Sequence, residues 1–397
     1  MVTLLVTAGL SGPALAENVD CRTSGSFESW LARFKQQAAA GGISSAAIAA
    51  ASPYLVYDQH IVNIDRGQRI FSQQFLEFSD KMLAGGRVSS GQSVIHKHAA
   101  EFAREEKEYG VPPAVITAFW GLESDFGANM GNYQAIKSLV TLAYDCRRAD
   151  MFRGHLFDAL RLIERGDVQA SEMIGSWAGE LGQTQMMPSE YFKYAVDYDG
   201  DGKRNLLHSA ADVIGSTANY LVNLGWKRGE PWLQEVRVPA NLPWEEADLT
   251  IQHPRSKWAS LGVTLPDGKP LPSDQLPASL LLPMGRFGPA FLAYSNFQVY
   301  LKWNNSLVYS TTAAYYATRL AGAPTIHRGN GPIPPVTFEE TRELQQLLIK
   351  QGYDVGGADG KLGISTRAAV RAMQIKLGLP ADSYPNAELL LRMRGIR

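Results

Sequence analysis

The sequence contains little cysteine, no excess of either charge and no long apolar run. Only two of its 397 residues are cysteines, and 38 Lys plus Arg stand against 39 Asp plus Glu. The net charge of -1 gives no electrostatic reason to expect a nucleic-acid partner. No run of about 18 uninterrupted apolar residues occurs, so we expect no membrane span.

Familiar catalytic signatures are also missing. The seven histidines form no HExxH pattern, which disfavours a metallopeptidase. His96 and His98 are two residues apart, so on a helix they would point in different directions and would not share a metal. No G-x-S-x-G motif and no phosphate-cradling glycine loop occurs, which disfavours serine hydrolases of that type and nucleotide-binding enzymes.

The composition is that of a globular protein with more than one domain. Hydrophobic residues make up 45% of the chain and charged residues 19%, which is ample material for a core. A chain of this length predicts roughly two or three units. The Gly- and Pro-rich stretch HRGNGPIPPVT is typical of a linker, which we place at residues 329–336. It separates a long unit, 17–328, from a small module, 337–397.

The N-terminus resembles a secretory signal. An apolar stretch ends in Ala14-Leu15-Ala16, which predicts a signal peptide at residues 1–16 with cleavage after Ala16. The first basic residue is Arg22, so the usual positive segment is missing. Either the true start lies upstream of Met1 or the signal is atypical; an ordinary apolar helix is the alternative.

The state predicted for the two cysteines depends on whether the protein is exported. In an exported protein, Cys21 and Cys146 predict a single disulfide that ties the mature N-terminus to the domain interior. The closed loop is long, and in the chain-entropy model it stabilises the fold by about 4–5 kcal/mol. In a cytosolic protein both would be free thiols.

The hydrophobic pattern predicts helices first and short strands later. Apolar residues at three- and four-residue spacing, closed by Gly, indicate helices in FESWLARFKQQAAAGG and GQSVIHKHAAEFAREEKEYG. From about residue 230 to 305, WLQEVRVP, SLLLPMG and FQVYLKW are typical of strands between Pro- and Gly-rich turns. A further helix is predicted in the segment SLVYSTTAAYYATRLAG. The 337–397 module contains three helical segments, in FEETRELQQLLIKQG, STRAAVRAMQIKLG and NAELLLRMRG.

The segment FWGLESDFGAN places Glu123 among Phe119, Trp120 and Phe126, in the last turn of a helix that Gly127 follows. One interpretation is a solvated glutamate at a helix end. The other is a carboxylic acid that apolar neighbours keep partly protonated, as a general acid requires.

The segment GSWAGELGQTQMMPSEYFKYAVDYDGDGKRN, residues 175–205, is dense in glycine and polar residues where a helical domain would ordinarily be apolar. Such a stretch is typical of a groove wall that binds a sugar chain, and a merely structural loop is the alternative. Five tryptophans offer stacking platforms for sugars, although buried core is the more frequent fate of this residue: Trp226, Trp232, Trp244, Trp258 and Trp303.

Four motifs, in order and spacing, resemble the soluble or membrane-bound lytic murein transglycosylase B family: ESDFG, GSWAGELGQTQMMPSEY, DYDGDGKRN and GSTANYL. The C-terminal LQQLLIKQGY, DGKLGISTRAAVRAMQ and LLLRMR resemble a peptidoglycan-binding domain. The resemblance implies a mainly α protein: a lysozyme-like helical catalytic domain with a small β-rich insertion, plus a C-terminal three-helix peptidoglycan-binding module.

The resemblance also implies roles for individual residues. Glu123 corresponds to the catalytic acid of the family, and Ser176, Gln185 and Tyr220 to its substrate contacts. Asn296 lies in the segment that resembles the far side of the cleft, and we expect it to bind substrate or to neighbour the site.

The activity implied is that of a lytic transglycosylase, a carbon-oxygen lyase acting on polysaccharide. One Glu, as acid and then as base, cleaves the β-1,4 bond between N-acetylmuramic acid and N-acetylglucosamine and leaves a 1,6-anhydromuramyl end. No second acid in a comparable setting is expected, because Asp125 faces away on the helix. The rival functions are a hydrolytic muramidase, which needs a second carboxylate, and a non-catalytic cell-wall-binding scaffold.

The acidic stretch DYDGDGKRN matches the first half of an EF-hand loop, with Asp197, Asp199 and Asp201 at alternate positions. The twelfth position is His208 instead of the usual Glu, and the family implies Asp212 as the closing ligand. A structural Ca2+ is one interpretation, and an acidic turn without metal is the other. No cofactor is required for the chemistry.

The expected partner is the glycan strand of peptidoglycan, and the expected location is the periplasm of the bacterial cell envelope. The sequence identifies no protein partner.

Overall fold

A computed structural model describes residues 20–67, 73–333 and 336–395 of the chain. The predicted signal segment 1–16 lies outside the described residues, as do residues 334 and 335 of the predicted linker. Among the described helices, none combines the length and the apolar character needed to cross a membrane.

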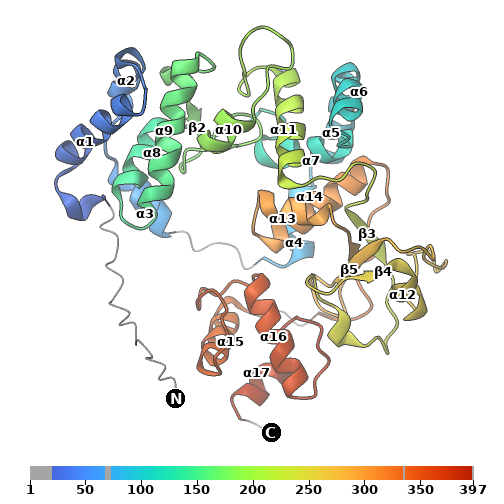
Figure 1. Cartoon of the computed structure of the whole chain (residues 1–397). Coiled ribbons are helices and arrows are strands. Elements are labelled where there is room, and N and C mark those ends of the chain that lie inside the picture. Colours follow the sequence, from blue (N-terminus) through green and yellow to red (C-terminus); the bar gives the residue numbers. More distant parts are fainter. Residues whose placement is uncertain (1–19, 68–72, 334–335, 396–397) are drawn as a thin grey trace, which may run out of the picture.

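One group of helices is built around α8 (Ala135–Tyr144) and α9 (Ala149–Arg165), which pack against each other. It lies on the left of Figure 1. The predicted disulfide is present: it joins Cys21, just before the first helix, to Cys146 in the turn between α8 and α9. The other members of this group are α1 (Phe27–Ala40), α2 (Ser45–Ala51), α3 (Gln59–Gly67) and α10 (Pro188–Tyr194).

A second group surrounds α7 (Pro113–Ser124), whose residues are buried on nearly every side. Its main neighbour is α14 (Leu307–Leu320), which packs along it. Because α7 lies inside the domain, its last turn brings Glu123 to the interior. The remaining helices here are α4 (Phe75–Met82), α5 (Arg87–Lys97), α6 (Ala99–Glu108), α11 (Ala210–Leu224) and α13 (Phe297–Trp303).

One predicted helix is interrupted, and one predicted strand was wrong. The segment GQSVIHKHAAEFAREEKEYG is divided between α5 and α6, because His98 leaves the helical conformation with φ -110° and ψ 31°. FQVYLKW, predicted as a strand, is helix α13. Its buried Phe297, Tyr300 and Leu301 recur at three- and four-residue spacing, so packing against the helices outweighed the strand propensity of the segment.

The predicted β-rich insertion is an antiparallel sheet with strand order β3-β6-β5-β4. The strands are β3 (Leu233–Val236), β4 (His253–Pro254), β5 (Pro277–Leu281) and β6 (Ala290–Ala293), and the short helix α12 is Arg255–Ser260. The sheet has its own apolar core, centred on the fully buried Trp258. A separate two-stranded ladder pairs β1 (Tyr133–Gln134) with β2 (Ile174–Gly175) beside α8.

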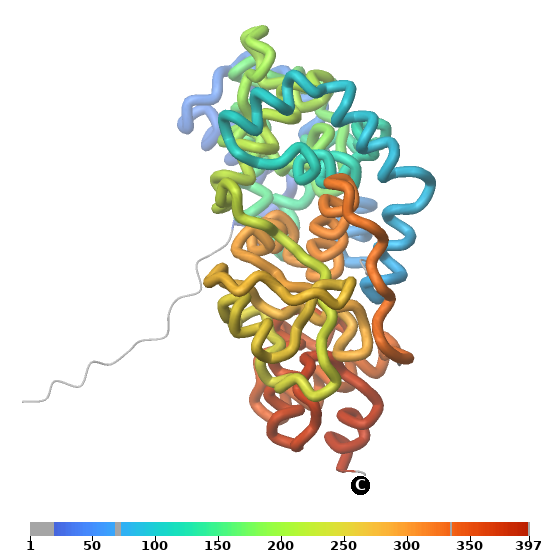
Figure 2. The backbone as a smooth tube through the Cα atoms, turned by 90° about the vertical axis from the view of Figure 1, so that its right-hand side faces the viewer, coloured from blue at the N-terminus to red at the C-terminus, as the bar shows by residue number. Residues whose placement is uncertain are grey.

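The C-terminal module consists of α15 (Phe338–Lys350), α16 (Ile364–Lys376) and α17 (Ala387–Met393), as predicted, around a small core of its own. It packs against the β insertion, at the end of the molecule opposite the N-terminal helices (Figure 2). The buried Arg367 donates to the carbonyl oxygens of Leu282 and Pro283, at 2.5 and 3.3 Å. Asp382 accepts from the backbone N–H of Arg286 at 3.0 Å.

Candidate active site

Glu123 is positioned by an abrupt helix end. Proline at the first turn starts α7, and Asp125 ends it in the left-handed conformation, with φ 53°. Gly127 follows at φ 89°, and a Cβ there would lie 2.5 Å from Oε1 of Gln183, so only glycine fits. The Ser124 hydroxyl accepts from the N–H of Gly127 and donates to the carbonyl oxygen of Gln183. The end of α7 is therefore fixed to the loop that follows β2.

The Glu123 carboxyl receives two hydrogen bonds on the same oxygen. The indole N–H of Trp303 donates to Oε1 at 3.0 Å, and the Tyr309 hydroxyl donates to Oε1 as well. The Trp303 ring is stacked on Phe119, with centroids 4.3 Å apart. Among the described residues no donor reaches Oε2. The side chain is half-buried, so a ligand can approach this second oxygen.

The pKa of Glu123 is raised to about 7, chiefly because protein surrounds the carboxyl. The hydrogen bonds from Tyr309 and Trp303 act in the opposite direction, since they favour the ionised form, and the negative charge of Glu180 raises the pKa further. The aromatic setting differs from the predicted one. Trp120 donates its N–H to Gln183 instead, at 2.9 Å.

Ser176 and Gln185 lie on the loop after β2, and both are half-buried. The Ser176 hydroxyl accepts from the N–H groups of Ala178 and Glu180, at 3.1 and 3.2 Å. Gln185 has φ 48°, an uncommon conformation for a residue other than glycine. Its amide donates to the carbonyl oxygens of Gly182, at 2.8 Å, and Met130, at 3.2 Å. The loop thus holds both predicted residues in fixed positions.

Tyr220, on α11, is linked to Glu123 through Trp303. Its ring stacks on Tyr194, with centroids 4.9 Å apart, and tilts against Trp303 at 5.2 Å. Burial raises the pKa of the Tyr220 hydroxyl, so it remains protonated. This half-buried row of aromatic rings ends at the catalytic candidate and has the character of a sugar-stacking surface.

Asn296 does not belong to this site, contrary to the prediction. It is fully buried, and its side chain is occupied by the backbone. Its oxygen accepts from the N–H of Lys227, and its amide donates to the carbonyl oxygens of Lys227 and Glu230, at 2.8 and 2.7 Å. The residue fixes a turn before the β insertion. The segment around Asn296 resembles a family motif, but this resemblance did not show that the Asn296 side chain points into the core.

Sequence reasoning missed Tyr309 and Glu180, and it gave Trp303 no special role. Trp303 was one of five tryptophans; Trp226 and Trp258 are core residues, as expected of the majority. Since FQVYLKW was taken for a strand, the proximity of its last residue to α7 was not visible. Trp303 and Tyr309 stand 180 and 186 residues from Glu123 in the sequence, and no local pattern connects them.

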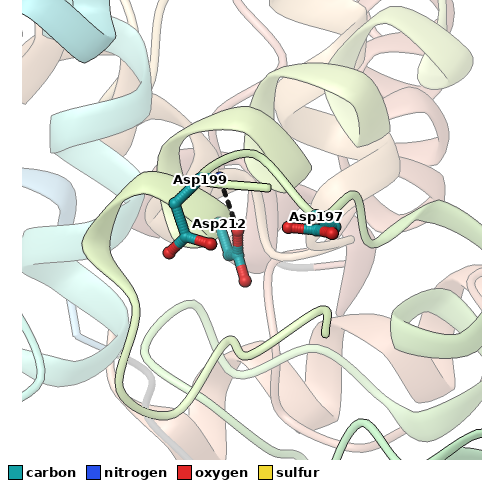
Figure 3. Close-up of side chains that lie close together, drawn as sticks. All are labelled: Asp197, Asp199 and Asp212. Carbon is teal, nitrogen blue, oxygen red and sulfur yellow. Dashed lines mark hydrogen bonds between the residues drawn. The ribbon is translucent and has the colours of Figure 1, made fainter. Parts of the chain in front are cut away.

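The acidic loop gathers three of the four predicted metal ligands. One oxygen each from Asp197, Asp199 and Asp212 lies within 4.8 Å of the others, and Figure 3 shows the three side chains together. Asp201 is exposed and lies outside this group; its carboxylate accepts from the N–H of Lys203 at 2.8 Å. Asp201 points away because its side chain caps the turn.

The donor set fits a hard cation in part. Asp212, at the start of α11, is fully buried and accepts from the N–H groups of Tyr198 and Asn205, at 2.6 and 2.7 Å. Asp197 accepts from two glycine N–H groups of the loop. Carboxylate oxygens are ligands that Ca2+ prefers, but the same contacts also stabilise an acidic turn without metal.

A half-buried carboxylic acid with a raised pKa, an aromatic row and a polar loop have the features of a glycan-cleaving site. Comparison with protein families agrees. The family model described as "Transglycosylase SLT domain" matches residues 26–318, and the chain belongs to that family. A second model, "Putative peptidoglycan binding domain", matches residues 338–393.

Three relatives illustrate the similarity. Membrane-bound lytic murein transglycosylase B of Escherichia coli is 31% identical over 239 residues, 59% of this chain, and the matched part spans 64% of that protein, less than two thirds. SltB3 of Pseudomonas aeruginosa, solved with NAG-anhNAM-pentapeptide, is 42% identical with a TM-score of 0.86 over 93% of this chain and 99% of its own. Escherichia coli Slt35, solved with calcium, is 29% identical with a TM-score of 0.57 over 66% and 83%.

Replacement of Tyr309 by Phe is expected to raise the pKa of Glu123 above about 7, because the lost hydrogen bond favours the ionised carboxylate. The expected rise is about one to two pH units. It is measured by carbon-13 NMR titration of the full chain labelled at glutamate carboxyls, with the Glu123 signal assigned by its loss in Glu123→Gln.

Tyr316→Phe is the matched control. It removes a hydroxyl from the same helix, but that hydroxyl donates to the carbonyl oxygen of Arg87. A Glu123 midpoint that stays in place or falls in Tyr309→Phe would show that the Tyr309 contact does not stabilise the ionised form.

Proposed function

We propose that this protein is a peptidoglycan lytic transglycosylase. It cleaves the β-1,4 bond between N-acetylmuramic acid and N-acetylglucosamine and closes a 1,6-anhydro ring on the muramyl end. The observation that carries the proposal is the Glu123 carboxyl, with a pKa raised to about 7 and both protein donors on Oε1. Membership of the transglycosylase family, and the SltB3 structure with an anhydro-muropeptide, support it.

The hydrogen-bond pattern determines which oxygen carries the proton. Trp303 and Tyr309 both donate to Oε1, so the acidic proton resides on Oε2, the oxygen without a protein donor. From there it passes to the glycosidic oxygen, and the bond from that oxygen to the muramyl anomeric carbon breaks. The leaving sugar takes the proton as a hydroxyl.

The second half of the reaction returns a proton to the same residue. Glu123, now a carboxylate, accepts the proton of the muramyl C6 hydroxyl, and O6 forms the new bond to the anomeric carbon while the N-acetyl group shields it. No water is consumed. An internal nucleophile gains on the order of 7–11 kcal/mol over an external one, so one protein carboxyl suffices.

The polar loop and the aromatic row would hold the glycan over Glu123. Ser176 and Gln185 offer hydrogen-bonding groups from one wall, and Tyr220 with Trp303 offers ring faces from the other. The 337–397 module would bind the same polymer and keep the enzyme on the wall, as its family match supports. The site of action would be the periplasm of the cell envelope.

A hydrolytic muramidase is the second candidate, and one observation favours it. Such an enzyme needs a second carboxylate to direct water. The negative charge of Glu180 raises the pKa of Glu123, so Glu180 is the candidate for such a second acid. The two functions give different products, because a hydrolase leaves a reducing end.

Mass spectrometry of muropeptides released from purified sacculi tests the proposal. The wild-type protein is expected to release anhydro products, lighter by one water than reducing-end muropeptides. Glu123→Gln is expected to lower their release by about 10²–10⁴-fold, because the proton donor is lost. Asp125→Asn is the matched control, since Asp125 points to solvent and pairs with Arg87 at 3.3 Å.

The released products also distinguish the proposed lytic transglycosylase from a hydrolytic muramidase and from a non-catalytic scaffold. Reducing-end products from the wild type would identify a hydrolase. Binding to sacculi without release of any product would identify a scaffold. Equal activity of Glu123→Gln and wild type would remove Glu123 from the mechanism.

We further propose that the acidic loop binds a structural Ca2+ through Asp197, Asp199 and Asp212. The grouping of their oxygens within 4.8 Å supports this, and Slt35 was solved with calcium. The ion would take no part in the chemistry. It would steady the segment between α10 and α11, which runs beside the polar loop through the bond from the N–H of Gln183 to the carbonyl oxygen of Leu206, at 2.9 Å.

Addition of Ca2+ to the chelator-treated protein is therefore expected to raise its melting temperature. At 100 times the dissociation constant, the gain is about 2.7 kcal/mol, or several degrees. Asp212→Asn is expected to abolish this Ca2+-dependent increment, and Asp201→Asn to retain it. If Ca2+ does not raise the melting temperature of the wild-type protein, the loop is an acidic turn that binds no metal.

A further inference from the structure

Gln183 is a buried glutamine that is bonded to α7 on both sides of Glu123. The indole N–H of Trp120, which precedes Glu123 by almost one helical turn, donates to the side-chain oxygen Oε1 of Gln183 at 2.9 Å. The hydroxyl of Ser124, the residue directly after Glu123, donates to the backbone carbonyl oxygen of Gln183 at 2.5 Å. The position of Glu123 therefore lies between two residues that are bonded to the same glutamine.

The other end of the Gln183 amide reaches a different segment of the chain. Its Nε2 donates to the carbonyl oxygen of Leu207, and its backbone N–H donates to that of Leu206, each at 2.9 Å. These leucines lie between the acidic loop and α11. Asn205 fixes them: its Oδ1 accepts from the N–H of Leu207 at 3.2 Å, and its own N–H donates to the buried Asp212 at 2.7 Å. Gln183 thus joins the end of α7 to the segment that follows the acidic loop.

The partners of the Gln183 amide determine its orientation. An indole N–H can only donate and a carbonyl oxygen can only accept, so the amide oxygen faces α7 and the amide nitrogen faces the leucine segment. Glycines make this close approach possible. A Cβ on Gly127 would lie 2.5 Å from Oε1 of Gln183, and a Cβ on Gly182 would lie 2.9 Å from the carbonyl oxygen of Leu206. The bridge is therefore tightly packed at both of its ends.

The bridge acts on the position of Glu123. The carboxyl is bonded by Trp303 and Tyr309, which come from α13 and α14. Since these two donors belong to other helices, they reach the carboxyl only when the last turn of α7 is held in place. Gln183 holds that turn through its bonds to α7. A displacement of a reacting group by about 1 Å can lower a reaction rate by about 10²-fold.

We infer that Gln183 is a positioning residue of the active site: its side-chain amide ties the last turn of α7 to the Leu206–Leu207 segment, and thereby holds the Glu123 carboxyl where Trp303 and Tyr309 reach it. The consequence for catalysis rests on the proposed function. The bridge itself does not, because it is a property of the free protein.

The test uses Gln183→Met, which keeps the length of the side chain, removes both amide hydrogen bonds and leaves the backbone bonds of the residue in place. Proton–nitrogen-15 spectra of the full chain, labelled at the tryptophan indoles, report two contacts. The Trp120 signal reports the bridge, and the Trp303 signal reports the bond to Glu123. Each signal is identified by its loss in Trp120→Phe or Trp303→Phe. Both signals are expected to shift in Gln183→Met, and the Trp120 indole proton to exchange with solvent about tenfold faster.

The same variant is expected to lower kcat on a soluble glycan by about 10- to 10²-fold and to leave KM within about twofold, because the acid is misplaced while the binding surface remains. Gln134→Met is the matched control. Its amide also bridges two segments, accepting from the N–H of Ile136 at 2.8 Å and donating to the carbonyl oxygen of Ala170 at 2.6 Å. These bonds do not involve α7, so both indole signals and kcat are expected to remain those of the wild type.

Asn205→Ala tests the bridge from its other end and decides the inference if Gln183→Met does not fold. It removes the acceptor that fixes Leu207. The Trp303 signal is expected to shift in Asn205→Ala, and Asn205→Ala is expected to add nothing in the Gln183→Met background, since the connection is already broken. Effects of the two substitutions that add would overturn the inference.

Two further results would contradict it. One is a Trp303 signal that stays in place in Gln183→Met while the Trp120 signal moves, because the bridge would then not position Glu123. The other is an equal change in Gln134→Met, which would indicate general loosening of the fold. If the wild type cleaves no glycan, the proposed function fails, and the indole signals still decide whether Gln183 holds Glu123.

Discussion

The hydrogen bonds from Trp303 and Tyr309 to one oxygen of Glu123 are the contacts on which the arrangement of this protein depends. They join the end of α7 to α13 and α14, 180 and 186 residues further along the chain. To form them, the β insertion between α11 and α13 must fold so that the chain returns to α7. The stacking of Trp303 on Phe119 and its contact with Tyr220 also form only when the chain returns to α7 after the β insertion.

A half-buried acid that must first donate and then recover a proton faces opposing demands. Protein around Glu123 raises its pKa to about 7, which keeps the acid protonated near neutral pH, while two donors on Oε1 prevent the pKa from rising further. The unpaired Oε2 remains available to a ligand. The charge of Glu180 raises the pKa further. The same geometry therefore serves proton donation and proton recovery.

Local signals in the sequence were sufficient for part of this account. Proline and glycine marked both ends of α7, and the family motifs pointed to Glu123, Ser176, Gln185 and Tyr220. Of these, Glu123 and Tyr220 both contact Trp303. Burial could not be deduced: Asn296 lies in a motif-like segment but points inward, and Asp201 follows the alternation but faces solvent. The charge of Glu180 and the donors Trp303 and Tyr309 depend on tertiary contacts that no local spacing encodes.

The central claim is that Glu123 acts as a protonated acid, and the pH dependence of kcat/KM on a defined soluble glycan tests it most directly. This parameter reports the ionisation of the free enzyme. The account predicts that kcat/KM is maintained below about pH 7 and falls above it, tenfold per pH unit, as the Glu123 proton is lost. A profile that continues unchanged through that region would show that another group supplies the proton.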